Sequence, residues 1–301
     1  MQPLSYRTQV EARSQFVTVR GLRYHVTQWG TASIERPPLV LLHGWMDVGA
    51  SFQFCVDAMA DQRWVIAPDW RGFGRSDSPA ADSYWFPDYL GDLEALLDVL
   101  APDQAVDLVG HSMGGNVAML YAGVRPKRVR RLVNMEGFGM PDATPEQAPT
   151  RYAQWLEDIK TPQRLRDYAS LPEVADRLMK NNPRLSAQRA AWLAPHWARE
   201  SGDGRWHIQG DPAHKRIYPV LYRKAEAVAC WRAIEAPVLW LEGAQTDVAR
   251  FWGNRFPRSD FDERIAVVRK LQSRVIDNAG HMVHHDQPQH VAQAIEAFLR
   301  S

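Results

Sequence analysis

Short apolar runs alternate along the chain with longer stretches in which apolar residues recur at helical spacing. Continuous apolar runs of four to six residues are typical of strands buried on both faces of a parallel sheet. The predicted strands are Phe16–Val19, Leu22–Gln28, Pro38–Leu42, Trp64–Ala67, Ala105–Val109, Arg131–Met135, Pro237–Leu241 and Arg274–Ile276. The first two flank Gly21 and predict a hairpin, whereas the alternation of strands and helices predicts an α/β fold with a mostly parallel sheet.

Helical spacing appears between most of these strands, and it continues through a long segment without a predicted strand. The predicted helices are Ser51–Ala60, Tyr89–Leu100, Asn116–Ala122, Tyr152–Ile159, Pro172–Lys180, Ser186–Ala198, Asp260–Leu271 and Pro288–Leu299. Ser186 is a suitable N-cap residue for its helix. Because residues 137–231 contain only helical patterns, we predict a core formed by residues 1–136 and 232–301, with residues 137–231 as a helical insertion.

Composition and charge exclude several classes of function. The 301 residues include 36 Lys and Arg against 35 Asp and Glu, so no overall field attracts nucleic acid or an anionic membrane. No apolar run approaches the roughly 20 residues of a membrane span, and the N-terminal residues lack the apolar segment of a signal peptide. Cys55 and Cys230 lie far apart in sequence and predict free thiols. These features predict a cytoplasmic protein that binds neither nucleic acid nor membranes, and they leave its oligomeric state open.

The pentapeptide Gly110–Gly114, with Ser112 at its centre, carries the main chemical signal. It matches the pattern G-x-S-x-G, and it stands between the predicted strand Ala105–Val109 and the predicted helix Asn116–Ala122. A residue on such a sharp strand-to-helix turn adopts a strained backbone, and its neighbours two positions away must be small. This turn lifts a serine hydroxyl clear of the sheet. The sequence therefore predicts Ser112 as a nucleophile.

A serine hydroxyl needs a neighbouring base to act as a nucleophile at neutral pH. His281 follows the last predicted strand, at the sheet edge where catalytic groups of parallel sheets gather. We therefore predict His281 as the base, with His284 and His285 as rivals. A metal site formed by these three histidines and Asp286 has no supporting spacing, so no metal is predicted.

The base in turn needs a carboxylate that orients its ring. Asp247 lies in the loop after the strand Pro237–Leu241, which gives the chain order serine, acid, histidine. Glu136 and Glu242, which end neighbouring strands, are the alternatives. We predict Asp247 as the acid and keep Glu136 as the alternative acid.

Two backbone N–H groups are expected to bind the oxyanion that forms when a carbonyl is attacked. The N–H of Met113 follows the nucleophile, and the N–H of Trp45 lies in the loop after the strand Pro38–Leu42. Met46, Phe138 and Trp155 are candidate residues of a substrate pocket, because aromatic and apolar side chains line such pockets.

Together these motifs give the chain a clear resemblance to the α/β-hydrolase superfamily, and within it to the capped hydrolases with a serine nucleophile. The resemblance extends from Phe16 to Leu299, and its motifs are His43-Gly44-Trp45, Asp69–Asp77, Gly110–Gly114, Asp247 and Gly280-His281. It implies an eight-stranded core sheet, a helical cap over the active site, and no cofactor. Asp247 stands four residues after Gly243, whereas the family usually places this acid three residues after its glycine.

The sequence thus predicts a serine hydrolase that cleaves an ester or a related small acyl compound. Related dehalogenases and epoxide hydrolases resemble this chain but carry an aspartate as the nucleophile, so Ser112 argues against both chemistries. The alternatives are hydrolysis of a carbon–carbon bond in a diketone formed by ring cleavage, hydrolysis of an amide or lactone, and a ligand-binding protein without turnover. The glycines of Asp69–Asp77 do not predict a dinucleotide site, because Asp77 stands where the third glycine is needed.

Overall fold

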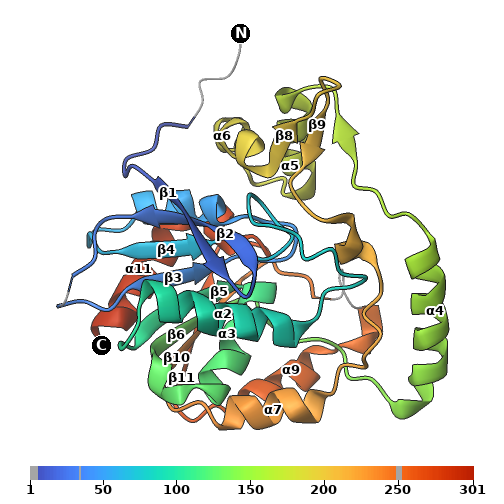
Figure 1. Ribbon diagram of the computed structural model, residues 1–301. Coiled ribbons are helices and arrows are strands. Elements are labelled where there is room, and N and C mark those ends of the chain that lie inside the picture. Colours follow the sequence, from blue (N-terminus) through green and yellow to red (C-terminus); the bar gives the residue numbers. More distant parts are fainter. Residues whose placement is uncertain (1–5, 34, 249–252) are drawn as a thin grey trace.

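An eight-stranded sheet crosses the middle of the molecule (Figure 1). The computed structural model describes residues 6–33, 35–248 and 253–301. In the order β1-β2-β4-β3-β5-β6-β10-β11, the strands are Arg13–Val19, Leu22–Trp29, Val65–Pro68, Leu39–Leu42, Val106–His111, Val129–Met135, Val238–Gly243 and Leu271–Ile276. The predicted fold class, a mostly parallel sheet flanked by helices, is confirmed.

The sheet is antiparallel only at the edge that carries the first strand. β1 and β2 form the predicted hairpin, in which Val19 pairs with Leu22 and Gly21 adopts a φ of 78°. β2 also runs antiparallel to β4, and all further pairs are parallel. The carboxyl ends of β3, β5, β6, β10 and β11 therefore meet at one edge, which is where a parallel sheet places its ligand site.

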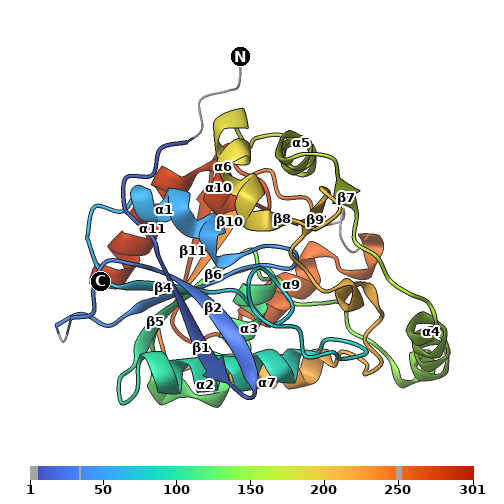
Figure 2. The ribbon, with the colours of Figure 1, turned by 45° about the horizontal axis from the view of Figure 1, so that its top comes forward.

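Helices cover both faces of the sheet (Figure 2). The α-helices are α1 Gln53–Asp57, α2 Phe86–Leu100, α3 Met113–Val124, α4 Ala148–Lys160, α5 Leu171–Asn181, α6 Ala187–Trp197, α7 Lys224–Arg232, α9 Arg258–Ile265, α10 Val283–Asp286 and α11 Pro288–Arg300. Short 3-10 helices span Gly49–Phe52, Pro126–Arg128, Pro145–Gln147, Pro212–Lys215 and Gly253–Arg255. α1 and α11 lie on one face, and α2, α3 and α7 lie on the other.

The strands β3, β4, β5 and β10 bury both of their faces, as their continuous apolar runs predict, whereas the edge strands β1 and β11 are mostly exposed. Along β3, Val40 and Leu42 belong to the core on the side of α2 and α3, whereas Leu39 and Leu41 belong to the core on the side of α1 and α11. This alternation follows from the two-residue period of a strand. All four side chains are at most 2% exposed, so β3 has no face left for polar residues.

Residues 137–223, which we call the cap, lie in the chain between β6 and α7. They form α4, α5, α6 and a small antiparallel sheet of β7 Asp167–Tyr168, β9 Trp206–Ile208 and β8 Ala198–Glu200. Ser186 caps α6, as predicted, by accepting a hydrogen bond from the N–H of Arg189 at 3.3 Å. α7 packs against α3 in the core, although the predicted insertion extends to residue 231.

The insertion and the predicted helix Asp260–Leu271 differ from the sequence-based expectation. The segment 137–231 contains strands, but each is only two or three residues long, too short to show a period of two. The predicted helix Asp260–Leu271 corresponds to α9, which ends at Ile265. Turns and loop follow over residues 266–270, and Leu271 pairs with Val238 as the first residue of β11. Tertiary pairing overrides the local helical pattern at this point.

Two further observations bear on the expectations from composition. Cys55 is buried and Cys230 is half-buried, and both thiols are free. Within the described residues, no helix combines the length and the apolar character that a bilayer crossing requires.

Candidate active site

Ser112 occupies the bend between β5 and α3, as the pentapeptide predicts. β5 ends at His111, α3 begins at Met113, and Ser112 between them has φ 51° and ψ −113°. A positive φ is strained for a residue with a Cβ, and such strain persists only where surrounding contacts hold it. Here the N–H of Ser112 donates to the carbonyl of Met135 at 2.8 Å, and its own carbonyl accepts from the N–H of Asn116 at 3.0 Å.

The glycines on either side of Ser112 are required by close backbone packing. A Cβ added to Gly110 would lie 2.4 Å from the carbonyl oxygen of Gly114. A Cβ added to Gly114 would lie 2.1 Å from the carbonyl oxygen of Leu42, in the neighbouring strand β3. Both distances are far below van der Waals contact, and both obstacles are backbone atoms that cannot turn away.

Gly114→Ala is therefore expected to destabilise the fold by about 1–3 kcal/mol, the usual cost of forcing extra atoms into a packed core. The free energy of unfolding in urea measures this loss. Gly202→Ala is the matched control, because its Cβ would meet nothing within 4 Å and the change should stay within about 0.5 kcal/mol. Equal stability of the two variants would contradict the packing argument.

The imidazole of His281 connects Ser112 to a buried carboxylate. His281 stands in the loop between β11 and α10, and its Nε2 lies 3.0 Å from Ser112 Oγ. On its other side, Nδ1 lies 3.2 Å from Oε2 of Glu136. The side chain of His281 is 24% exposed and that of Glu136 is fully buried. The ring can thus accept the Ser112 proton on one nitrogen while its other N–H points to a carboxylate.

Glu136 is held tightly where β6 ends. It follows Met135 directly and has a positive φ of 62°. Its Oε1 accepts hydrogen bonds from the N–H of Gly243 at 2.6 Å and from Oγ1 of Thr246 at 2.8 Å. Because β6 and β10 are neighbours in the sheet, the last residue of β10 and the loop after it supply donors for the carboxylate that follows β6.

The prediction that Asp247 orients the base does not match this arrangement. Asp247 is exposed to solvent in the loop after β10, and the carboxylate at Nδ1 of His281 is Glu136. Glu242, the other alternative, accepts from Trp240 Nε1 at 3.0 Å and forms an ion pair with Arg258. The alternative acid Glu136 therefore replaces Asp247 as the candidate partner of the histidine.

Burial dominates the electrostatics of this site. It raises the pKa of Glu136 to about 8, although the hydrogen bonds from Gly243 and Thr246 favour the ionised form. Burial also lowers the pKa of His281 to about 4, so its imidazole is neutral at pH 7. A neutral imidazole is the form that can accept the Ser112 proton.

One predicted oxyanion donor, Met113, follows Ser112 in the chain, and the other, Trp45, belongs to a loop that passes close to Ser112 in space. Met113 is the first residue of α3, where a backbone N–H has no acceptor within its own helix. The loop after β3 passes close to the nucleophile, because a Cβ added to Gly44 would lie 3.2 Å from Cβ of Ser112. Nε2 of the buried His43 accepts from the N–H of Trp70 at 2.8 Å and braces this loop. The roles of Trp45 and Met113 as donors stay predictions.

The three candidate pocket residues lie in different surroundings. Phe138 is 5% exposed and packs edge-on against Trp240 and Phe261, each with ring centroids 4.9 Å away, so it is a core residue. Met46 is partly buried against the same core and faces Gly210 of the cap. Trp155 is half-buried on α4.

The site geometry and the fold agree with what sequence and structure comparisons find. The family model of the alpha/beta hydrolase fold matches residues 37–288. The chain belongs to the α/β-hydrolase family. The matched range includes the cap as well as most of the core.

Curated relatives of this α/β-hydrolase include two enzymes that are named for their substrates. It is 29% identical to a 3-hydroxybutyrate-oligomer hydrolase of Cupriavidus necator over 291 residues, which cover 92% of each chain. It is 26% identical to an sn-1-specific diacylglycerol lipase of Mus musculus, over 87% of this chain and 81% of the lipase. Among solved structures, the thioesterase domain from the curacin biosynthetic pathway superposes with a TM-score of 0.83 at 23% identity, covering 95% of this chain and 99% of that chain.

Proposed function

We propose that this α/β-hydrolase is a serine hydrolase that cleaves carboxylic esters through an acyl-enzyme intermediate. The observation that carries the proposal is the 3.0 Å contact between His281 Nε2 and Ser112 Oγ at a strained strand-to-helix bend. A nucleophile and a base within hydrogen-bond reach, with the base oriented by a third group, are the signature of nucleophilic catalysis.

The proposed reaction has two halves. Ser112 Oγ attacks the ester carbonyl while His281 Nε2 takes the hydroxyl proton, and the resulting oxyanion receives hydrogen bonds from the N–H groups of Trp45 and Met113. Collapse of this intermediate breaks the bond to the alcohol, which leaves with the proton from His281. His281 then takes a proton from a water molecule as the water attacks the acyl-serine. The bond between the acyl carbon and Ser112 Oγ breaks, the proton returns from His281 to Ser112 Oγ, and the carboxylic acid is released. Glu136 holds the histidine ring throughout and, in its ionised form, stabilises the charged imidazolium.

The ester assignment is supported by the nucleophile and by the relatives. An activated alcohol is suited to acyl transfer, whereas the related epoxide-opening chemistry uses a carboxylate to attack carbon. The hydrolase of Cupriavidus necator and the lipase of Mus musculus are named for an ester oligomer and an ester lipid, respectively. We therefore propose a carboxylic ester as the substrate class.

A panel of substrates tests this proposal on the intact protein. Aryl esters of increasing acyl chain length should be hydrolysed. A dimer of 3-hydroxybutyrate and a diacylglycerol test the two ester types suggested by the names of the relatives. A ring-cleavage diketone and an anilide belong in the same panel. Hydrolysis of the diketone at a higher kcat/KM than every ester would overturn the ester assignment and favour carbon–carbon bond cleavage. A folded protein that turns over none of them, and takes up no fluorophosphonate on Ser112, would favour a ligand-binding role.

The raised pKa of Glu136 predicts the pH profile of the proposed reaction. We expect kcat/KM to rise as His281 loses its proton near pH 4, and to rise again near pH 8 as Glu136 ionises and can stabilise the imidazolium. Thr246→Val removes a donor that favours ionised Glu136, so it should move the upper rise to higher pH. Thr246→Ser keeps the donor and is the control. A profile that is identical in Thr246→Val and Thr246→Ser would contradict the proposed role of Glu136.

A further inference from the structure

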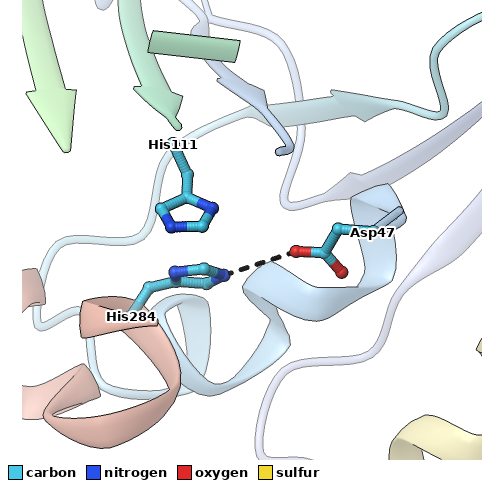
Figure 3. A group of neighbouring side chains, drawn as sticks. All are labelled: Asp47, His111 and His284. Carbon is cyan, nitrogen blue, oxygen red and sulfur yellow. Dashed lines mark ion pairs between the residues drawn. The ribbon is translucent and has the colours of Figure 1, made fainter. Parts of the chain in front are cut away.

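A cluster of three buried polar side chains lies beside the catalytic residues and has no role in the proposed reaction. Asp47 follows β3, His111 ends β5, and His284 stands in α10 (Figure 3). Asp47 is 3%, His111 2% and His284 0% exposed. Each residue offers one nitrogen or oxygen atom, and these three atoms lie within 4.8 Å of one another. Nε2 of His284 lies 3.7 Å from Oδ2 of Asp47.

Most polar atoms of this cluster have no hydrogen-bond partner among the residues that the structure describes. Within the described residues, Oδ2 of Asp47, Nδ1 of His111 and both ring nitrogens of His284 are buried and have no hydrogen-bond partner. Buried polar atoms in folded proteins are nearly always paired, because an unpaired one loses its hydration without replacement. Four such atoms on three neighbouring side chains therefore require an explanation that the protein's own groups do not supply.

The remaining polar atoms of Asp47 and His111 are held by backbone groups and by the hydroxyl of Ser51, in the way that metal ligands are usually held. Nε2 of His111 lies 2.8 Å from the carbonyl oxygen of His281, and because a carbonyl can only accept, this nitrogen carries the proton. Nδ1 of His111 then presents a lone pair. Oδ1 of Asp47 accepts from the N–H of Val48 at 2.8 Å and from the hydroxyl of Ser51, which leaves Oδ2 free. Such contacts fix the tautomer and direction of ligating side chains.

We propose that Asp47, His111 and His284 form a binding site for one divalent transition-metal ion of the zinc type. Two imidazole nitrogens and one carboxylate oxygen suit zinc and cobalt(II), whereas calcium and magnesium prefer oxygen ligands alone. Around a tetrahedral ion with bonds of about 2.0–2.1 Å, ligand atoms lie about 3.4 Å apart. The 3.7 Å between His284 and Asp47 is already close to this value.

The proposed metal site is separate from the hydrolytic reaction, because no step of that reaction uses a metal ion. It is nevertheless coupled to the catalytic base, because His111 donates to the backbone carbonyl of His281 and precedes Ser112 in the chain. An ion that fixes the His111 ring would therefore also fix the loop that carries His281. The three ligands lie at positions 47, 111 and 284, so no spacing along the chain reveals them.

Metal uptake by the intact protein tests the site directly. The chelator-treated and dialysed protein is titrated with zinc chloride, and bound zinc is counted by elemental analysis after gel filtration. We expect one equivalent per chain and a rise in the unfolding temperature, because an ion that binds only the folded state stabilises it. Cobalt(II) chloride in place of zinc should give the visible absorption of a tetrahedral complex, which reports the coordination geometry without any activity measurement.

Variants identify the ligands. Asp47→Asn and His284→Gln should each weaken zinc binding by roughly 10–100-fold or more, the range found even for groups that only support a ligand. His285→Gln is the matched control, since His285 is the next residue of α10 and is also buried, at 2% exposure. His290→Gln controls for the exposed histidine of α11.

Several outcomes would overturn the proposal. Absence of stoichiometric zinc uptake by the folded wild-type protein would do so, as would uptake that is lost in His285→Gln or His290→Gln but kept in His284→Gln. If both ligand variants fail to fold, the cobalt(II) spectrum of the wild-type protein decides, and an octahedral spectrum contradicts a buried site. Loss of ester hydrolysis would not affect these measurements, so failure of the metal site and failure of the proposed function are distinguishable.

Discussion

Ser112→Ala is expected to lower kcat for ester hydrolysis by a factor on the order of 10⁶, because loss of the nucleophile removes the acyl-enzyme route altogether. The folded structure should survive this change. Ser112 has a φ of 51°, and alanine carries the same strain there, so the free energy of unfolding should change by less than about 1 kcal/mol. Steady-state kinetics and urea denaturation of the same preparation measure both quantities.

Labelling with a fluorophosphonate makes this prediction independent of the substrate chosen. The wild-type protein should take up one equivalent on Ser112, and Ser112→Ala should take up none. Ser273→Ala, at an exposed position on β11, is the control variant and should label like the wild type. Persistent labelling of Ser112→Ala would mean that another hydroxyl is the nucleophile.

The core of the fold could be predicted from the sequence because its central strands are buried on both faces. Runs such as Leu39–Leu42 contain no polar residue, and their alternation with amphipathic helices permits few topologies. The cap lacked such a signal. Its strands, including Trp206–Ile208, pair over only two or three residues, so their formation depends on neighbours distant in sequence.

The candidate site was predictable to the extent that it is local in sequence. Ser112 is marked by its flanking glycines and His281 by its place after the last strand, and the structure brings the two together at 3.0 Å. No local sequence pattern identifies the acid. Asp247 and Glu136 both follow a strand, and the choice between them depends on side-chain burial and on which carboxylate faces Nδ1. One signal could have favoured Glu136, because a carboxylate directly after a buried strand lies at the sheet edge that carries the nucleophile.

Glu136→Gln is expected to lower kcat by a factor on the order of 10⁴, the effect of the equivalent carboxylate-to-amide change in a serine triad. The amide can keep an oxygen toward Gly243 and Thr246, which places its NH₂ group at Nδ1 of His281. Nδ1 must then accept a hydrogen bond, and the ring proton moves to Nε2. In this tautomer, Nε2 cannot accept the Ser112 proton.

The same substitution should not destabilise the protein at high pH. The pKa of Glu136 is raised in the folded state, so the buried acid contributes stability below its unfolded pKa and loses that contribution as the pH rises toward 8. A neutral glutamine has no such dependence. The free energy of unfolding of Glu136→Gln, relative to that of the wild type, should therefore increase as the pH rises from about 4.5 to about 8. Urea denaturation across this range measures the difference.

Asp247→Asn separates the two carboxylates that the sequence left as candidates. Asp247 is exposed, so its conversion to an amide should change kcat by less than about threefold and the free energy of unfolding by less than about 0.5 kcal/mol. The comparison is matched, because both variants replace a carboxylate by its amide in a loop that follows a neighbouring strand. A loss of activity in Asp247→Asn as large as that in Glu136→Gln would return the acid role to Asp247. It would also mean that the loop after β10 moves toward His281 during the reaction.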